Sequence, residues 1–332
     1  MERVRVGFAT FAHVHAPAYA RALKEDLFTV ADLVGIYDDD SARGRKAAET
    51  FGGAFYTDYA ALLADVDVVI VTAENARHTP FVLSAAERKK HILVEKPIAT
   101  TVADAEAMIA AAKRHGVVLF TAFPVRYSPA IRRLKAFIEA GEIGRVLAIK
   151  STNRGQNPGG WFNDPRLSGG GAVMDHTVHL VDVMRWILKA EVKDVYAEIG
   201  YTVIEGQKVD DRGILTVEWT NGVFASIDCS WSRNAKYPTW GDVTLEVIGT
   251  DGVVWVDAFH QKLNVFTNAD GYRYHDFGDD INVALLDDFL RHVRTGEGDV
   301  YISGEDGLAA LRVALWAYEA ERKGRKVAVG ER

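Results

Sequence analysis

Strand-like apolar runs alternate with helix-like segments along the first 120 residues, and this alternation constrains the fold more than any other feature. The run at 66–72 (V-D-V-V-I-V-T) is almost continuously apolar, as a strand covered on both faces requires. Regular alternation of this kind is typical of a parallel α/β sheet. We therefore expect a Rossmann-like unit with strands at 4–9, 30–37, 66–72, 91–94 and 117–120 and helices at 17–23, 41–51 and 102–115.

After about residue 124 the pattern changes to segments of period two that follow one another without helices between them. The turn signals T-N-G at 220–222 and T-D-G at 250–252 indicate hairpins. This half predicts an α+β domain with a mostly antiparallel open sheet. Its strands are expected at 193–203, 213–219, 223–231, 244–248, 253–256 and 262–266, and its helices at 172–188 and 304–322.

Charge and cysteine content narrow the class of protein. Lysine and arginine number 39 against 46 acidic residues, which gives a net charge of −7 and argues against a nucleic-acid partner. Cys229 is the only cysteine, which excludes an intrachain disulfide and fits a reducing cytoplasm. No apolar run reaches the roughly 18 residues of a membrane span, and we see no signal-peptide pattern. We expect a cytoplasmic protein that does not bind membranes.

The turn after the first strand has the small residues that a dinucleotide pyrophosphate requires. Its best fit to G-x-G-x-x-G is Gly7-x-Ala9-x-x-Ala12, with alanine at two of the three glycine positions. The alternative is a small-residue turn in another kind of α/β protein. We predict cofactor contacts from this turn, at Gly7, Ala9, Thr10, Phe11, Ala12 and His13.

Asp38 ends the second strand, where a carboxylate can accept both hydroxyls of an adenosine ribose. Asp39 and Asp40 follow and would repel a 2′-phosphate, so we expect NAD rather than NADP. Arg43 is the only nearby cation in the sequence, and it would soften that preference. The alternative is a solvated acidic turn that caps the helix beginning at residue 41.

Polar residues also follow the third strand, at Thr72, Asn75 and His78. The carboxyl ends of strands in open sheets face the ligand crevice, so these three are candidate cofactor contacts. For His78, a purely local role at a helix start is the alternative.

Val94-Glu95-Lys96-Pro97 ends the fourth strand. Pro97 removes a backbone donor and disfavours helical geometry at Lys96, which places the ammonium at the strand end. Oxidation of an alcohol needs a base for the hydroxyl proton, and a lysine can serve if burial and positive charge lower its pKa from about 10.4. A surface lysine without a catalytic role is the alternative.

Glycines at 169–171 open a helix on which Asp175, His179 and Asp182 share one stripe. The helix dipole keeps Asp175 ionised, and a carboxylate one turn from His179 can hold a neutral imidazole in one tautomer for proton transfer. A capping aspartate beside an unrelated histidine is the alternative. For His176 we favour a role in packing or hydrogen bonding over a role in catalysis. Because neighbouring helix residues diverge, a metal site at Asp175, His176 and His179 is disfavoured, and we expect no metal.

The loop at 153–164 (N-R-G-Q-N-P-G-G-W-F-N-D) combines amide, guanidinium and aromatic groups, which suit a polyhydroxylated ligand. Asn153 and Trp161 are its candidate substrate contacts. Trp231, Tyr237 and Trp240 could add aromatic contacts, although such residues at strand ends are more often core or interface residues.

Together these residues resemble the glucose-fructose oxidoreductase/inositol dehydrogenase (Gfo/Idh/MocA) family over nearly the whole chain. The likeness is carried by the first turn ending in His15, Asp38, Asn75 with His78, Val94-Glu95-Lys96-Pro97, Arg126 within F-P-V-R-Y, the glycines at 169–171, Asp175 with His179, and E-D-G-L at 305–308.

The resemblance implies a Rossmann NAD-binding domain at 1–123 and an α+β substrate-binding and oligomerisation domain at 124–332. It implies hydride transfer between NAD(P) and a C–OH/C=O carbon of a sugar, inositol or related polyol, by a homodimer or homotetramer formed through the second sheet. Lys96 would be catalytic, with Asp175 and His179 as the substrate-binding and proton-transferring pair. Glu95, Lys96 and Arg126 would join the cofactor contacts. The substrate contacts would be Lys96, Arg126, Asn153, Trp161, Asp175, His176 and His179.

The chain departs from the family pattern at Ala9 and Ala12, at Glu74 where proline is usual, and at His176 where an apolar residue is usual. Two other classes of function stay open. One is an enzyme that retains its NAD and uses a transient ketone for elimination or glycoside cleavage. The other is a sugar or dinucleotide sensor without turnover, against which the intact Lys96, Asp175 and His179 argue.

Overall fold

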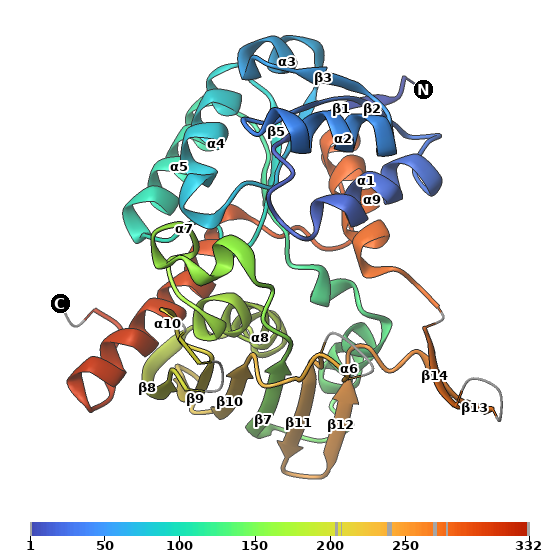
Figure 1. The fold of residues 1–332 in the computed structure, drawn as a ribbon. Coiled ribbons are helices and arrows are strands. Elements are labelled where there is room, and N and C mark those ends of the chain that lie inside the picture. The colour runs from blue at the N-terminus through green and yellow to red at the C-terminus, as the bar shows by residue number, and fades with distance from the viewer. Residues whose placement is uncertain are drawn as a thin grey trace. The chain divides into compact units, whose positions relative to one another are not determined.

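The computed structural model describes residues 2–202, 205–206, 208–237, 241–267, 271–276 and 278–330. The chain forms two compact units, and Figure 1 labels many of their elements. The first comprises Met1–Pro124, Arg166–Gly169 and Asp280–Leu311, and the second comprises Val125–Pro165, Gly170–Asp279 and Arg312–Arg332. The units are therefore discontinuous in sequence, and the single boundary after residue 123 stays a prediction of functional domains.

The first unit contains a six-stranded parallel sheet of order β3-β2-β1-β4-β5-β6. This is the strand order of the doubly wound Rossmann fold, which confirms the predicted class. Its elements are β1 (Val4–Ala9), α1 (Ala16–Glu25), β2 (Ala31–Tyr37), α2 (Ser41–Phe51), β3 (Ala54–Tyr56), α3 (Tyr59–Asp65), β4 (Val68–Val71), η1 (Asn75–Arg77), α4 (His78–Glu87), β5 (His91–Val94), α5 (Val102–His115), β6 (Leu119–Thr121) and α9 (Ile281–Thr295).

Local sequence explains where several of these elements begin and end. The side chain of Asp40 accepts hydrogen bonds from the first backbone N–H groups of α2, and Asp58 does the same for α3. Gly116 ends α5 in the left-handed conformation that favours glycine. Every residue of β4 is buried, as its apolar run predicts. The polar residues that follow β1, β2, β4 and β5 consequently lie at the carboxyl edge of one sheet.

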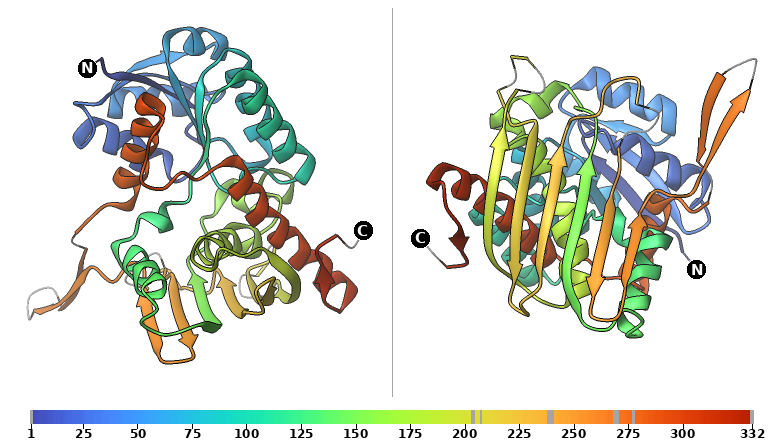
Figure 2. Two further views of the ribbon diagram at one scale, coloured as in Figure 1. Left: turned by 180° about the vertical axis from the view of Figure 1, so that it is seen from behind. Right: turned by 90° about the horizontal axis from the view of Figure 1, so that it is seen from below.

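The second unit contains a seven-stranded sheet of order β12-β11-β7-β10-β9-β8-β15, whose strands run side by side in Figure 2. Its neighbours are antiparallel except β7 and β10, which are parallel, so the mostly antiparallel prediction is confirmed. Its elements are α6 (Pro129–Glu139), β7 (Val146–Arg154), η3 (Gly160–Asn163), α8 (Ala172–Leu188), β8 (Val192–Gly200), β9 (Arg212–Trp219), β10 (Phe224–Ser230), β11 (Thr244–Gly249), β12 (Val253–Asp257), β13 (Lys262–Thr267), β14 (Gly271–Asp276) and β15 (Val327–Ala328).

Three helices contain a sequence boundary between the units, so that their residues belong partly to each: η2 (Pro124–Tyr127), α7 (Pro165–Ser168) and α10 (Gly304–Lys323). In the second unit, α8 packs on one face of the sheet, against β7, β9 and β10. Strands β13 and β14 pair with each other as a hairpin, not with the larger sheet. No helix within the described ranges is long and apolar enough to cross a membrane.

Candidate active site

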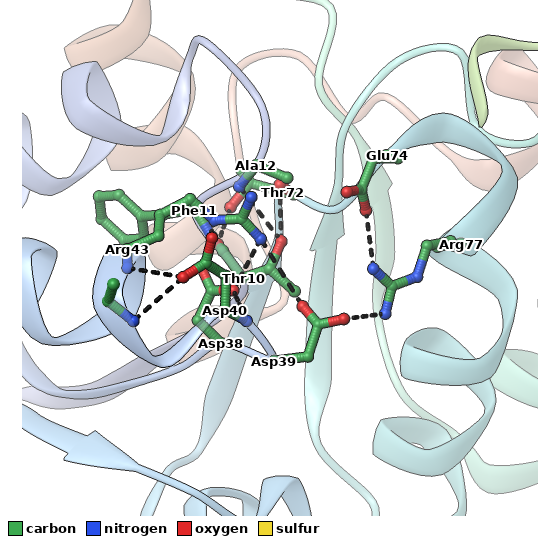
Figure 3. Close-up of polar contacts among 11 residues, drawn as sticks. Thr10, Phe11, Ala12, Asp38, Asp39, Asp40, Arg43, Thr72, Glu74 and Arg77 are labelled. Carbon is green, nitrogen blue, oxygen red and sulfur yellow. Dashed lines mark hydrogen bonds and ion pairs between the residues drawn. The ribbon is translucent and has the colours of Figure 1, made fainter. Parts of the chain in front are cut away.

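The turn after β1 is tied to the ends of β2 and β4 (Figure 3). Thr10 has a φ of +66°, in the region that favours glycine, and its backbone N–H donates to Tyr37 O at 2.7 Å. The Thr10 hydroxyl donates to Thr72 O at 3.0 Å, and the Thr72 hydroxyl donates to Thr10 O at 2.6 Å. These reciprocal bonds stabilise a tight turn in a chain that lacks the usual second glycine.

The predicted glycine and alanines of this turn have separate surroundings. Gly7 lies inside β1, where a Cβ atom would meet Leu62 Cδ1 at 2.9 Å, so a larger residue there would require the Leu62 side chain of α3 to shift. Ala9 is fully buried at the end of β1. The backbone N–H of Ala12 donates to the Thr10 hydroxyl at 3.3 Å. Gly7 therefore serves packing inside the sheet, and the cofactor contacts of Ala9 and Ala12 stay predictions.

Asp38 follows β2 and is almost fully buried, and donors surround its carboxylate (Figure 3). Phe11 N donates to Oδ2 at 2.8 Å and Asp40 N donates to Oδ1 at 2.9 Å. Arg43 donates to the same two oxygens, through Nε at 2.8 Å and Nη2 at 2.7 Å. Four donors match the roughly four lone-pair positions of a carboxylate. A ribose can use Asp38 only where Arg43 gives up its bonds.

A second arginine also reaches the acidic turn, which corrects the expectation that Arg43 is the only nearby cation. Arg77 at the end of η1 pairs with Asp39 at 2.6 Å and with Glu74 at 3.1 Å, as Figure 3 shows. Arg43 lies 3.6 Å from Asp39. Glu74, one of the residues that depart from the family pattern, therefore belongs to a network of alternating charges. Capping of α2 falls to Asp40 and not to Asp38.

Asn75 and His78 follow β4 and are both buried. Asn75 Nδ2 donates to Ser168 O at 2.9 Å, while Asn75 Oδ1 has no hydrogen-bond partner within the described part of the chain. A buried acceptor without a donor is costly, and a donor group of a bound cofactor would satisfy it. Both ring nitrogens of His78 lie 3.1 Å from backbone carbonyls, those of Ile98 and Ala73. Burial lowers the pKa of His78, and this geometry favours the local role.

Glu95 is a buried carboxylate at the end of β5 with donors on several sides. Tyr19 donates to Oε1 at 2.6 Å, the backbone N–H of Lys96 donates to Oε2 at 3.0 Å, and His15 Nδ1 lies 3.0 Å from Oε1. Burial would raise the pKa of Glu95, but His13, His15 and Lys96 hold it well below its usual range. Glu95 is therefore ionised at neutral pH.

The same residues include a group of metal-type ligands. The ligand atoms of His13, His15 and Glu95 all lie within 4.8 Å of one another. His13 Nδ1 accepts from the backbone N–H of His15 at 3.2 Å, so in a neutral ring Nε2 carries the hydrogen and faces Glu95 Oε2 at 3.9 Å. The distance of 3.9 Å is too long for a hydrogen bond, and the expectation of no metal stays a prediction. Lys96 follows directly, buried and joined to Pro97 by a cis peptide bond.

In the second unit, the first turn of α8 is held by Asp210, a residue that the sequence analysis missed. Its carboxylate accepts from Gly171 N at 2.8 Å and from Val173 N at 2.7 Å, and Tyr318 donates to it at 2.6 Å. A Cβ atom on Gly171 would meet Asp210 O at 1.8 Å, so the third glycine of the run is required for this close approach. Nothing local to Asp210 marks it, because its partners lie about forty or a hundred residues away along the chain.

Asp175 lies in the first turn of α8 and contacts two aromatic rings. Trp231 Nε1 donates to Asp175 Oδ2 at 3.2 Å, and His176 Nε2 lies 3.2 Å from the same oxygen. The other ring nitrogen of His176, Nδ1, lies 2.8 Å from Asn153 O. His179 is buried one turn further along α8, and its pairing with Asp175 stays a prediction.

Several of the predicted substrate contacts in the second unit already interact with other residues of the protein. Asn153 Nδ2 donates to Asp242 O at 3.0 Å, whereas its buried Oδ1 finds no donor among the described residues. Trp161 stacks on Phe162 with ring centroids 3.9 Å apart. Tyr237 lies beneath the Arg233 guanidinium at 4.1 Å. Trp240 lies outside the described residues.

Arg126 forms a buried ion pair with Asp182 of α8. Its Nε donates to Oδ2 at 2.8 Å and its Nη2 donates to Oδ1 at 2.5 Å. Both side chains are almost fully buried, and the guanidinium also lies 5.7 Å from the Trp186 ring centroid. This bidentate pair explains why Asp182 shares the stripe of Asp175 and His179. The predicted ligand contacts of Arg126 stay predictions.

Comparisons with known proteins bear on the whole chain. Residues 3–123 match the model of an oxidoreductase family with an NAD-binding Rossmann fold, and residues 131–255 match the GFO/IDH/MocA C-terminal domain. The chain is 30% identical to myo-inositol 2-dehydrogenase of Thermotoga maritima, with 98% of each chain covered. It is 29% identical to D-xylose 1-dehydrogenase [NADP(+)] of Haloarcula marismortui, covering 76% of this chain and 72% of the relative.

A solved structure gives the same result. The crystal structure of GenD2 from gentamicin A biosynthesis, in complex with NAD, superimposes with a TM-score of 0.90 at 26% identity, covering 100% of this chain and 97% of the other. The matched family models together span the parallel sheet with its carboxyl-edge residues and most of the second sheet. This chain therefore belongs to the Gfo/Idh/MocA family of NAD-binding oxidoreductases.

Proposed function

We propose that this protein transfers a hydride between NAD and a C–OH/C=O carbon of a sugar, inositol or related polyol. The observation that carries the proposal is the position of Lys96, a buried amine that directly follows the ionised Glu95 at the carboxyl edge of a Rossmann sheet. The relatives named for myo-inositol and D-xylose support the substrate class.

NAD, when bound, supplies the hydride acceptor for alcohol oxidation. In our proposal Lys96 Nζ takes the proton of the substrate hydroxyl, and His179 assists that transfer. Asp175 Oδ1 and Asn153 Oδ1 accept hydrogen bonds from substrate hydroxyls and so orient the ring. Lys96 belongs to the first unit and the other three residues to the second, so their union in one site is itself part of the proposal.

The acidic turn after β2 supports NAD over NADP. A 2′-phosphate would meet Asp38 and Asp39, and both nearby arginines are already paired with carboxylates. Comparison of kcat/KM for the two cofactors tests this preference. Equal values, or values that favour NADP, would remove Asp38 from its role at the ribose.

We also propose that the second sheet mediates a homodimer or homotetramer, and that the protein is cytoplasmic. The face of the sheet opposite α8 exposes Ile214, Phe224 and Trp255. A shallow hollow on that face is lined by Thr152, Asp228 and other outward-facing residues. Sedimentation equilibrium of the parent and of Trp255→Glu checks the assembly, because a buried charge at an interface would shift the population toward smaller species.

A panel of sugars, inositols and uronic derivatives, followed by NADH absorbance, tests the activity. Stoichiometric NADH with one or more polyols supports the proposal. Net conversion of a substrate without NADH in the medium would instead favour an enzyme that retains its cofactor for elimination or glycoside cleavage. Tight sugar binding with no hydride transfer to bound NAD would favour the sensor.

A further inference from the structure

We infer that the buried carboxylate of Glu95 shifts the preference of the cofactor site from NADH toward NAD⁺. The two forms of the cofactor differ by one positive charge, which lies on the nicotinamide ring of NAD⁺. A fixed negative charge in the half of the sheet that receives this ring therefore attracts one form and not the other. The inference deepens the proposed function, because it assigns to Glu95 the choice between the two oxidation states.

The strand order of the parallel sheet places Glu95 in the nicotinamide half. In a Rossmann fold the dinucleotide lies across the carboxyl edge of the sheet, with one mononucleotide on each half. Asp38, which we assign to the adenosine ribose, follows β2 in the half β3-β2-β1. The other half is β4-β5-β6, and Glu95 directly follows β5. The charge of Glu95 consequently lies at the edge where the nicotinamide mononucleotide is expected.

Asn75 supports the same placement by an independent observation. It follows β4, the strand that pairs with β5, and its buried Oδ1 has no hydrogen-bond donor among the residues that the structure describes. Its Nδ2 donates to Ser168 O at 2.9 Å, which holds the amide in place. A nicotinamide carboxamide carries N–H donors of the kind that this oxygen lacks. Asn75 and Glu95 therefore fit two different parts of one nicotinamide, its amide and its ring charge.

Hydrogen bonds hold Glu95 as an anion in one position. Tyr19 donates to Oε1 at 2.6 Å, and the backbone N–H of Lys96 donates to Oε2 at 3.0 Å. Burial, together with the charge of Glu95, raises the pKa of Tyr19 well above its ordinary value, so Tyr19 keeps its hydrogen and donates. Burial would raise the pKa of Glu95 as well, but His13, His15 and Lys96 hold it well below its usual range. The carboxylate is therefore charged throughout the pH range in which the protein would work, and the surrounding protein screens it far less than water would.

Positive charge on neighbouring side chains does not remove this effect. His13, His15 and Lys96 stay in place when Glu95 is replaced, whatever charge each of them carries. Loss of the Glu95 charge then makes the surroundings of the cofactor more positive by one unit. The change disfavours the cationic ring of NAD⁺ and leaves the uncharged ring of NADH nearly unaffected.

A bias toward NAD⁺ has a consequence for turnover, and this consequence rests on the proposed function. An enzyme that oxidises polyols repeatedly releases NADH and binds NAD⁺ after each hydride transfer. A charge that favours NAD⁺ over NADH promotes this exchange. Glu95 thereby contributes to cofactor exchange, a role separate from the proton transfer that we assign to Lys96.

Calorimetric titration of the parent protein and of Glu95→Gln, each with NAD⁺ and with NADH, tests the inference by four Kd values. Glutamine keeps the size of the side chain and one acceptor oxygen, but it carries no charge. We expect the ratio of the Kd for NADH to the Kd for NAD⁺ to fall about tenfold in Glu95→Gln, the lower end of what one nearby charge does to an ionisation equilibrium. Most of the change should come from weaker NAD⁺ binding. An unchanged ratio, including an equal rise of both Kd values, would overturn the inference, because a merely structural role does not distinguish the two forms.

Tyr19→Phe is the matched control, because it removes a hydrogen bond of Glu95 and keeps the charge. Its ratio of Kd values should stay within about twofold of the parent ratio, and a tenfold change would show that geometry and not charge sets the preference. If Glu95→Gln does not fold, Tyr19→Phe/Glu95→Met replaces both partners of the bond by apolar groups and should show the same loss of preference. The titrations need no polyol, so a failed polyol assay would refute the proposed function and leave this inference standing.

Discussion

Replacing Arg43 should strengthen NAD binding and weaken NADP binding. Arg43 donates two hydrogen bonds to Asp38, the carboxylate that we assign to the adenosine ribose. Ribose hydroxyls must displace these bonds, because Phe11 N and Asp40 N occupy the remaining positions of the carboxylate. In Arg43→Met the same carboxylate is open to the ribose, while the cation nearest to a 2′-phosphate is lost.

The size of the effect follows from exposure of the ion pair. The Arg43 side chain is 32% exposed, so solvent screens its pairing with Asp38, and we assign the pair about 0.5–1 kcal/mol. At about 1.4 kcal/mol per factor of ten, the Kd for NAD should fall about two- to fivefold. Burial of unscreened charge on Asp38 opposes part of this gain, which makes fivefold an upper value.

Titration of the protein with each dinucleotide, followed by calorimetry, gives both Kd values without turnover. Arg45→Met is the matched control, because Arg45 lies on the same helix and its guanidinium stacks on Phe55 instead of pairing with Asp38. The control should change neither Kd by more than about twofold. If Arg43→Met is folded and binds NAD more weakly than the control does, Arg43 orients Asp38 for the ribose and the competition argument is wrong.

Four further predictions follow from single residues. Lys96→Ala should lower kcat by about 10²- to 10⁴-fold with little change in NAD affinity; retention of more than about a tenth of the parent rate would refute the assigned base. Gly171→Ala should lower the free energy of unfolding in urea by about 1–3 kcal/mol or more, because a Cβ atom would meet Asp210 O at 1.8 Å. The control Gly252→Ala should be near neutral, because its Cβ atom would have its nearest contact at 3.5 Å. Equal effects of the two substitutions would contradict the close approach of Gly171 to Asp210. The lowered pKa of Glu95 contributes stability that is present above about pH 4.3 and is lost as the pH falls below it. In Glu95→Gln the free energy of unfolding should therefore decrease less steeply with falling pH in the acid range. An unchanged acid dependence would argue against the ionised carboxylate. Burial raises the pKa of the Cys229 thiol to about 12, so the native protein should react with a thiol reagent at pH 8 far more slowly than the urea-unfolded chain, and equal rates would contradict this burial.

Element types in the first unit could be read from the sequence because each depends on its own residues. The predicted strands at 4–9 and 91–94 and the predicted helices at 41–51 and 102–115 agree with β1, β5, α2 and α5 residue for residue. Strand β7 was missed because buried Ser151 and Asn153 break its apolar alternation. Helix α9 was missed too, and its membership of the first unit depends on packing against α1, which no local pattern encodes.

The sequence by itself determined the parallel and mostly antiparallel sheets, the family, and the candidates Lys96, Asp38, Asp175 and His179, since these follow from periodicity and from motifs of fixed spacing. Only the tertiary structure decided how charges and protons are paired. Arg126 meets Asp182 across 56 residues, and Arg77 meets Asp39 across 38. Such contacts depend on ångström distances between side chains that the folded backbone brings together. For that reason the contacts of the His176 ring with the Asp175 carboxylate and the Asn153 carbonyl emerged only from the structure.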